Sequence, residues 1–264
     1  MSSAKPRNSE ARVRAIYRKL TRAWGAQHWW PGETPFEVIA GAILTQNTSW
    51  TNVERALANL RSAGILSLGG MREVQLEELQ ELIRSSGYYR QKAARLKNFV
   101  AFVDARYQGS LEQMFAVHTS QLRSQLLGLN GIGPETADSI LLYAGNHEIF
   151  VVDAYTRRIL ERHEALPASA KYDEVRDLAE RALQNPKAFS PISGRANNLP
   201  SPPAHLPSTM SQALRSPLAQ TYNEMHGLLV QVGKHYCYRR EPKCETCPLR
   251  SLLPKTRIER GPLA

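Results

Sequence analysis

The chain has 264 residues, of which 42% are hydrophobic and 22% charged, enough for one or two packed domains. Its 34 lysine and arginine residues outnumber its 24 aspartate and glutamate residues, giving a formal net charge of 34 − 24 = +10 that favours a polyanionic partner. No apolar run reaches the roughly 18 residues of a membrane span, and the polar first ten residues hold no signal core. We therefore expect a cytoplasmic protein that does not enter membranes.

Apolar residues recur at helical spacing along most of the chain, and no convincing strand alternation appears. We predict an all-α protein in which residues 31–147 form a six-helix bundle. Residues 11–30 and 148–250 should form a second, discontinuous helical domain. The predicted helices cover residues 11–24, 35–60 in two parts, 76–83, 92–107, 111–117, 121–127, 134–144, 154–162, 172–183 and 218–234.

Residues 185–217 differ from the rest of the chain in composition. They contain seven of the 16 prolines, several serines and few large apolar side chains. Such a segment cannot bury enough apolar surface to offset the entropy of ordering it. We predict a disordered Pro/Ser-rich insertion here.

The most informative stretch is Leu-Asn-Gly-Ile-Gly-Pro-Glu-Thr-Ala-Asp, residues 129–138. Three glycines between residues 128 and 133 predict a turn in which left-handed backbone angles are inexpensive. Pro134 suits the first helical position, and Glu135 complements the positive end of the helix. The pattern predicts a helical hairpin. Its bare turn either serves the connection alone or lets backbone N–H groups approach a phosphate.

A short apolar run, residues 149–152, ends at Asp153, and a new helix follows. Asp153 is therefore expected at a helix N-cap, where a carboxylate has a purely structural use. A carboxylate held by backbone N–H groups also stays ionised and fixed, so a chemical role is compatible with the cap.

The three cysteines form a Cys-x6-Cys-x2-Cys cluster of Cys237, Cys244 and Cys247. Spacing this close favours a metal site over a disulfide framework. Arg239, Arg240 and other basic residues on the same loop could meet phosphates.

Together, the glycine hairpin, the apolar segment, the Val-Asp pair and the following helix resemble the helix-hairpin-helix DNA glycosylases of the endonuclease III superfamily. The resemblance runs from about residue 28 to 248 with one interruption. It implies the fold of that family and a monomeric, nucleoid-associated base-excision repair enzyme that binds double-stranded DNA containing a damaged base. It also implies that Asp153 drives base excision and that the hairpin, through Gly131, Gly133 and Thr136, grips the DNA backbone.

The polar residues 45–49 follow a buried helix and could simply start the next helix, with Thr48 or Ser49 as its cap. The resemblance implies more: Gln46, with Asn47 beside it, contacts DNA, and the Gln46 amide fills the space of the extruded nucleotide. Residues 87–93 are similar to the family's loop and helix at the DNA-facing mouth. Arg90 and Lys92 in that stretch could equally be ordinary solvated charges.

Bifunctional members of this superfamily carry a Schiff-base lysine two residues after the second hairpin glycine, where this chain has Glu135. A carboxylate cannot form a Schiff base, so a monofunctional enzyme is favoured. This is similar to the endonuclease III-like 3-methyladenine glycosylase branch, which implies an alkylated purine as substrate. The alternatives are a glycosylase and AP lyase acting on oxidised pyrimidines, and a non-catalytic damage sensor.

The family's iron–sulfur loop reads Cys-x6-Cys-x2-Cys-x5-Cys, and its fourth cysteine corresponds to Leu253. A [4Fe–4S] cluster with an outside ligand is the leading expectation. There are two alternative expectations. One is a three-iron or zinc site completed by His235, and the other is a loop without metal.

Overall fold

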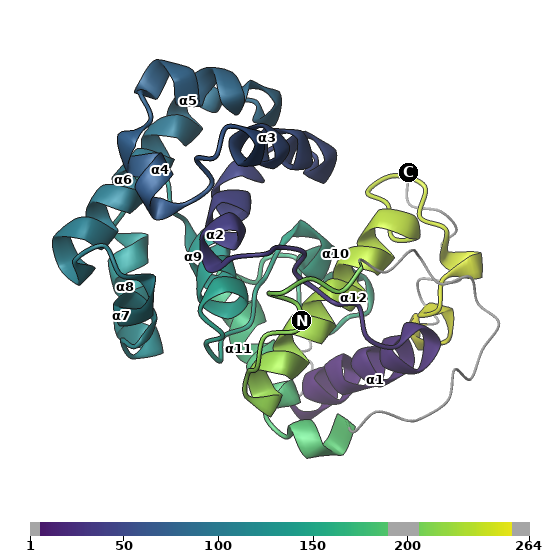
Figure 1. The fold of residues 1–264 in the computed structure, drawn as a ribbon. Helices are drawn as coiled ribbons and strands as arrows, with labels where there is room; N and C mark the ends of the chain where they lie inside the picture. The colour runs from purple at the N-terminus through teal and green to yellow at the C-terminus, as the bar shows by residue number, and fades with distance from the viewer. Residues whose placement is uncertain (1–5, 190–205, 255–264) are drawn as a thin grey trace. The chain divides into compact units, whose positions relative to one another are not determined.

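The structure is a computed structural model that describes residues 6–189 and 206–254 (Figure 1). All regular elements in these residues are helical, which confirms the all-α prediction. None of the described helices is both long and apolar enough to cross a membrane. The α-helices are α1 Pro6–Trp24, α2 Pro35–Leu44, α3 Trp50–Ser62, α4 Leu68–Glu73, α5 Leu76–Leu82, α6 Tyr89–Tyr107, α7 Leu111–Phe115, α8 Thr119–Leu127, α9 Pro134–Ser139, α10 Ala154–Arg162, α11 Tyr172–Leu183 and α12 Pro217–His235.

Short helical segments extend or join these helices. The segment η2 is a π-helical turn that continues α9, and the others are 3-10 turns. They are η1 Arg84–Ser86, η2 Ile140–Ala144, η3 Pro186–Phe189, η4 Cys244–Thr246 and η5 Arg250–Leu252.

The chain divides into two compact units. Among the described residues, the first unit holds 6–29, 148–189, 206–207 and 214–254, and the second holds 30–147 and 208–213. The second unit also includes a short segment, residues 208–213, from much later in the chain.

In the second unit the core forms around α2, which contacts α3, α6, α9 and η2. Residues 36–44 are all buried, as their almost continuous apolar sequence leads one to expect. Thr34 caps this helix by accepting the backbone N–H of Glu37 at 3.1 Å. Figure 1 shows α4 and α5 beside α6, which both of them contact.

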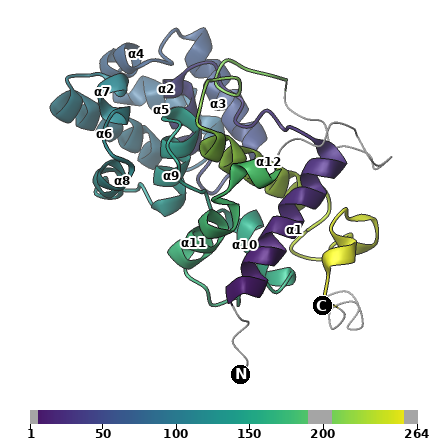
Figure 2. The same cartoon turned by 90° about the horizontal axis from the view of Figure 1, so that it is seen from below.

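In the first unit α1 packs on α11 and α12, and α10 packs on α12 (Figure 2). Gly233 permits the last of these contacts, because a Cβ atom there would overlap the Tyr155 ring. Close packing of α10 on α12 places side chains from residues 153–163 next to side chains from residues 226–237. The surroundings of Asp153 and the cysteine pocket, both described below, depend on this packing of α10 on α12.

The segment predicted to be a disordered insertion lies partly outside the described residues, which omit 190–205. The described residues of this segment make specific contacts. Residues 186–189 form η3, and the backbone N–H of Met210, a buried residue, donates to the Gly32 carbonyl at 3.0 Å. Ser208 also accepts the Gly32 N–H at 3.2 Å, so this part of the segment is anchored within the second unit.

Candidate functional site

Asp153 is the N-cap of α10, as predicted. One carboxylate oxygen accepts the backbone N–H of Thr156 at 2.7 Å, and the residue has extended backbone angles. Its side chain is 14% exposed. The carboxylate is therefore fixed in position, and a small part of the side chain remains accessible.

The second oxygen of Asp153 lies 3.6 Å from Nε2 of His226, a buried residue of α12. The imidazole sits near the rings of Trp29 and Phe150. Burial raises the pKa of Asp153, but attraction to the His226 imidazole and the bonds from Thr156 outweigh burial and bring the pKa below its ordinary value. Asp153 is thus an anion at neutral pH.

The predicted hairpin consists of α8 and the α9–η2 segment. Gly131 has φ +83°, a conformation that favours glycine, and any Cβ there would overlap the Arg95 side chain. Arg123 on α8 donates to both carboxylate oxygens of Asp138 on α9, at 2.6 and 3.2 Å, and Asp138 is fully buried. This bidentate ion pair locks the two helices together.

Gln46 connects the loop after α2 to this hairpin. Its Nε2 donates to the Gly131 carbonyl at 3.0 Å and to Oγ1 of Thr136 at 2.8 Å, and its Oε1 accepts from Arg95. Thr136 is buried, so its place is beneath the turn, as a support for Gln46. The structure therefore brings together three of the predicted DNA-binding residues.

The other predicted hairpin and loop residues lie at the surface. Asn47 is exposed with φ +54°, and Glu135 is exposed in the first turn of α9. Gly133 is exposed, has an ordinary φ of −89°, and a Cβ there would meet no atom within 4 Å. Because the fold does not require a glycine at this position, the bare backbone is available to another molecule.

Lys92 is not a solvated charge, and that interpretation of the sequence is wrong. It is 1% exposed, and its ammonium donates to the carbonyls of Leu44 at 2.9 Å and Ser86 at 2.6 Å. Burial, with the nearby charge of Arg95, lowers its pKa to about 8. Lys92 caps the C-terminal end of α2 from inside the core, a position that helical periodicity could not reveal.

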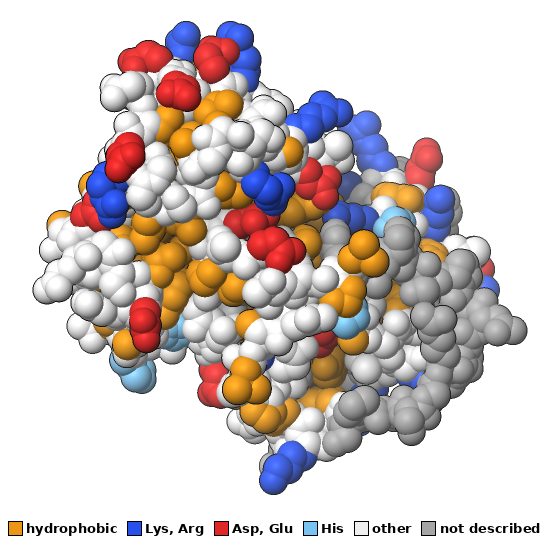
Figure 3. Space-filling model, viewed as in Figure 1, with side chains coloured by type: hydrophobic (Ala, Val, Ile, Leu, Met, Phe, Trp, Pro, Cys, Tyr) orange, Lys and Arg blue, Asp and Glu red, His pale blue; other side chains and the backbone are white. Residues whose placement is uncertain are grey.

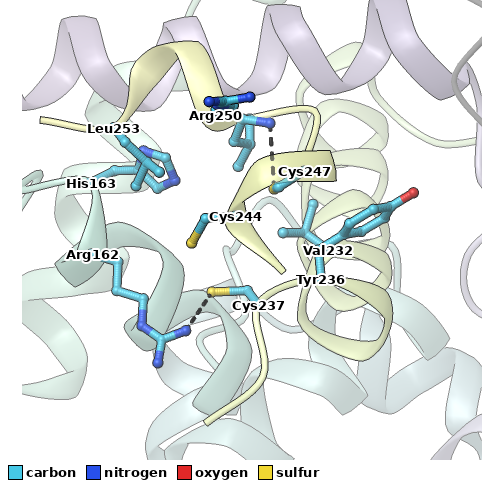
Figure 4. A pocket seen from close by; sticks show the side chains of 10 residues that line it. Arg162, His163, Val232, Tyr236, Cys237, Cys244, Cys247, Arg250 and Leu253 are labelled. Atoms are coloured by element: carbon cyan, nitrogen blue, oxygen red, sulfur yellow. Dashed lines mark hydrogen bonds between the residues drawn. The ribbon is translucent and has the colours of Figure 1, made fainter. Parts of the chain in front are cut away.

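The three cysteines line one pocket together with Arg162, His163 and Leu253 (Figure 4). Nη1 of Arg162 donates to the Cys237 sulfur at 3.2 Å, and the Leu249 N–H donates to the Cys247 sulfur at 3.5 Å. Burial raises the pKa of Cys247 to about 12. Such thiols keep their protons at neutral pH unless a metal cation displaces them.

Three thiols on one pocket, with N–H donors aimed at two of the sulfurs, form a donor set suited to iron or another thiophilic metal. No three of the described His, Cys, Asp and Glu side chains converge closely enough to hold a single metal ion. His235, the predicted additional ligand, is not among the residues lining the pocket, whereas His163 is.

The comparisons with known proteins agree with this geometry. The family model described as "HhH-GPD superfamily base excision DNA repair protein" matches residues 40–185, more than half of the chain. The chain belongs to the HhH-GPD superfamily. The matched segment includes Gln46, the hairpin and Asp153, and it ends before the cysteine loop.

Among curated HhH-GPD relatives, MJ1434 of Methanocaldococcus jannaschii, which is named as a candidate DNA repair glycosylase, is 41% identical over 89% of this chain and 92% of its own length. The solved structure of Helicobacter pylori 3-methyladenine DNA glycosylase (MagIII), bound to 1,N6-ethenoadenine, is 30% identical with a TM-score of 0.66. That match covers 86% of this chain and 97% of the other. A non-covalent complex of endonuclease III with DNA has the same fold at 19% identity, with a TM-score of 0.68 over 95% and 98% of the two chains. The chain is a base-excision repair DNA glycosylase of the HhH-GPD type, as its motifs led us to expect.

Net charge does not by itself locate the surface of this HhH-GPD protein that meets DNA. On the face shown in Figure 3, lysine and arginine side chains are interspersed with acidic and apolar ones. The contacts described above are therefore more informative than the overall charge of +10.

Proposed function

We propose that the protein is a monofunctional DNA glycosylase that hydrolyses the N-glycosidic bond of an alkylated purine in double-stranded DNA. The observation that carries this proposal is the fixed carboxylate of Asp153, held by Thr156 and flanked by His226. The proposal of a monofunctional mechanism rests on Glu135, which lies on the hairpin where bifunctional members of the superfamily carry a lysine.

Departure of the base leaves positive charge on the deoxyribose. An ionised carboxylate that is already in place stabilises this charge without reorganising during the reaction, and it can orient the attacking water. Hydrogen bonding at one oxygen and the imidazole beside the other keep Asp153 ionised and prevent it from rotating.

Strand cleavage through a Schiff base requires an accessible neutral amine. Glu135 offers none. Lys92 has the lowered pKa that such chemistry needs, yet its nitrogen is buried between two carbonyl groups. Lys92 is therefore structural, and the abasic site remains as the product.

An alkylated purine fits this set of residues because alkylation gives the base a positive charge, and a cationic base departs without protonation by an acid. The likeness to the H. pylori 3-methyladenine DNA glycosylase supports the same substrate class. Gly131 and Gly133 let the hairpin backbone approach a phosphate. Gln46 and Asn47 assist extrusion of the base.

The cysteine pocket holds a [4Fe–4S] cluster in this proposal, with Cys237, Cys244 and Cys247 as thiolate ligands. When bound, the cluster supplies cross-linking of the C-terminal loop rather than chemistry on the base. Arg162 then links the cysteine loop to α10, the helix that Asp153 caps.

The test is incubation of the full-length protein with duplexes that each contain one lesion, followed by electrophoresis with and without alkali. We expect strand breaks only after alkali, and only for duplexes with alkylated purines. Breaks without alkali would show a lyase, breaks with oxidised pyrimidines would show the other substrate class, and binding without breaks would show a damage sensor.

A further inference from the structure

We propose that Arg95 is a positioning residue that couples phosphate binding at the hairpin turn, residues 128–133, to the release of Gln46. The Arg95 guanidinium holds the Gln46 amide against the hairpin. When a DNA phosphate binds that guanidinium, Gln46 loses one of its partners and can leave the turn to enter the duplex. The inference rests on the proposed function, which places the hairpin on the DNA backbone and gives Gln46 a part in extruding the base.

The Gln46 amide is held at both of its ends. Its Nε2 donates to the Gly131 carbonyl at 3.0 Å and to Oγ1 of Thr136 at 2.8 Å, and its Oε1 accepts from Nη1 of Arg95. A carbonyl can only accept and a guanidinium can only donate, so these bonds determine which end of the amide faces which partner. Gln46 is therefore retained at the turn, and its release requires all three bonds to break.

Arg95 lies directly on the bare part of the hairpin turn. A Cβ atom on Gly131 would lie 2.9 Å from Cζ of Arg95, so the absence of a side chain there makes room for the guanidinium. In the proposed function, the same bare backbone approaches a DNA phosphate. A phosphate bound at this turn therefore comes within reach of Arg95.

The charge of Arg95 makes an anion a better partner than the amide. Among the described residues, its hydrogen-bond acceptor is the neutral Gln46 amide oxygen, and no carboxylate forms an ion pair with it. Arg95 is half-buried, so water screens its charge only in part. A guanidinium matches a phosphate in charge and in the geometry of its donors, which an amide oxygen does not. A phosphate should therefore displace Gln46 from Arg95.

Such coupling acts in both directions. If a phosphate on Arg95 weakens the hold on Gln46, then Gln46 weakens phosphate binding by Arg95 by the same factor. Removing the Gln46 amide should therefore tighten the binding of DNA that needs no base extruded. An arginine that only supports the hairpin predicts the opposite, because loss of either side chain would loosen the turn and weaken binding.

The experiment is a double-mutant cycle with full-length protein and an undamaged, fully paired duplex. Fluorescence anisotropy gives Kd at several salt concentrations for wild type, Gln46→Ala, Arg95→Met and the variant with both changes, with circular dichroism as the check of folding. We expect Gln46→Ala to bind about fivefold more tightly than wild type, the effect of one typical hydrogen bond. This gain should disappear when Arg95 is also replaced.

The salt dependence tests the phosphate contact itself. Arg95→Met should reduce the magnitude of the logarithmic salt slope by about 0.9, the value for one phosphate. Arg106→Met is the matched control, because it removes the same charge from an exposed position near the other end of α6. Its slope should equal that of wild type.

Three results would overturn the proposal. They are Gln46→Ala binding no tighter than wild type, an equal gain with and without Arg95, and an unchanged salt slope in Arg95→Met. If Arg95→Met does not fold, the side-chain amide NMR signal of Gln46 in wild type decides, after assignment by its loss in Gln46→Ala. That signal should shift when undamaged duplex is added, and an unmoved signal at saturation would contradict release. Excision of an alkylated purine is measured separately and reports on the glycosylase proposal alone.

Discussion

The two oxygens of Asp153 have different partners. A helix cap explains the bond from Thr156, because many helices begin with such an aspartate. The cap does not require His226, which comes from α12 and lies near the other oxygen. We infer that His226 is a positioning residue that holds the carboxylate in its ionised form.

This inference predicts a change in pH dependence for His226→Gln. The folded-state pKa of Asp153 lies below the ordinary value of 3.8, with His226 as one of its lowering influences. Removing the imidazole raises that pKa, so the carboxylate protonates at higher pH. The acidic limb of the kcat/KM profile should move upward in pH. His147→Gln, which alters a half-buried histidine of the second unit, is the control. Unchanged profiles for both variants would disprove the role of His226.

The contacts of Lys92 predict that replacing it changes the stability of the fold rather than the catalytic chemistry. Lys92→Met leaves two buried carbonyls without their donor and should lower the free energy of unfolding by about 2 kcal/mol. This corresponds to a melting temperature lower by roughly 4 to 8 °C.

The same lysine predicts a pH dependence of stability. The unfolded chain binds the Lys92 proton more tightly, with a pKa near 10.5 against about 8 when folded. The wild type should therefore gain stability relative to the variant as pH rises between these values. Equal melting temperatures and pH dependence would contradict this account.

At the scale of elements, the hairpin is held from two sides. The Arg123–Asp138 pair joins α8 to α9, and Gln46 joins the turn to the loop after α2. Gln46 must release the Gly131 carbonyl before its side chain can enter a duplex. Support of the turn and extrusion of the base are therefore two separate roles of Gln46, and they predict different results when Gln46 is replaced.

Excision by Gln46→Ala separates these two roles. If Gln46 assists extrusion, the rate should fall about tenfold or more, equivalent to ~1.4 kcal/mol, and the loss should be larger for well-paired lesions than for badly paired ones. Gln121→Ala, at an exposed position of α8, is the control. A loss that is equal for all pairings would leave Gln46 with support of the turn alone.

Local sequence was sufficient to predict many of the elements and insufficient where packing decides. Capping and periodicity predicted α2, the hairpin and the helix after Asp153. The prediction placed the starts of α1 and α6 too late and missed α4 altogether; α6 begins at Tyr89, three residues before the expected start. The α1 helix begins at Pro6, five residues before the expected start. The α4 helix contains two glycines, and a Cβ on Gly70 would lie 2.6 Å from Cα of Ile65. From sequence alone, a glycine that is needed for close packing cannot be distinguished from a glycine that ends a helix.

For the whole molecule, the net charge of +10 predicts binding that weakens with salt. The logarithmic slope should be about −0.9 per phosphate contact. Arg240 is exposed on the cysteine loop, and Arg240→Gln should reduce the magnitude of the slope by about one contact. Fluorescence anisotropy at several salt concentrations measures this slope. The same slope for variant and wild type would remove the loop from the DNA interface.

The site residues that sequence reasoning missed share one property. His226 lies beside Asp153, 73 residues away, and the burial of Lys92 depends on carbonyls 48 and 6 residues away. Spacing within one helix carries no information on such pairs. The motifs located Asp153 and the hairpin, and the fold supplied the residues that hold them in place.

The central claim is that the carboxylate of Asp153 stabilises the sugar as the base departs. Asp153→Asn retains the cap and removes the charge. Single-turnover excision of an alkylated purine measures the effect, with circular dichroism and DNA binding to verify the fold. We predict a rate lower by on the order of a hundredfold or more with binding retained. Excision at the wild-type rate by the folded variant would contradict the claim.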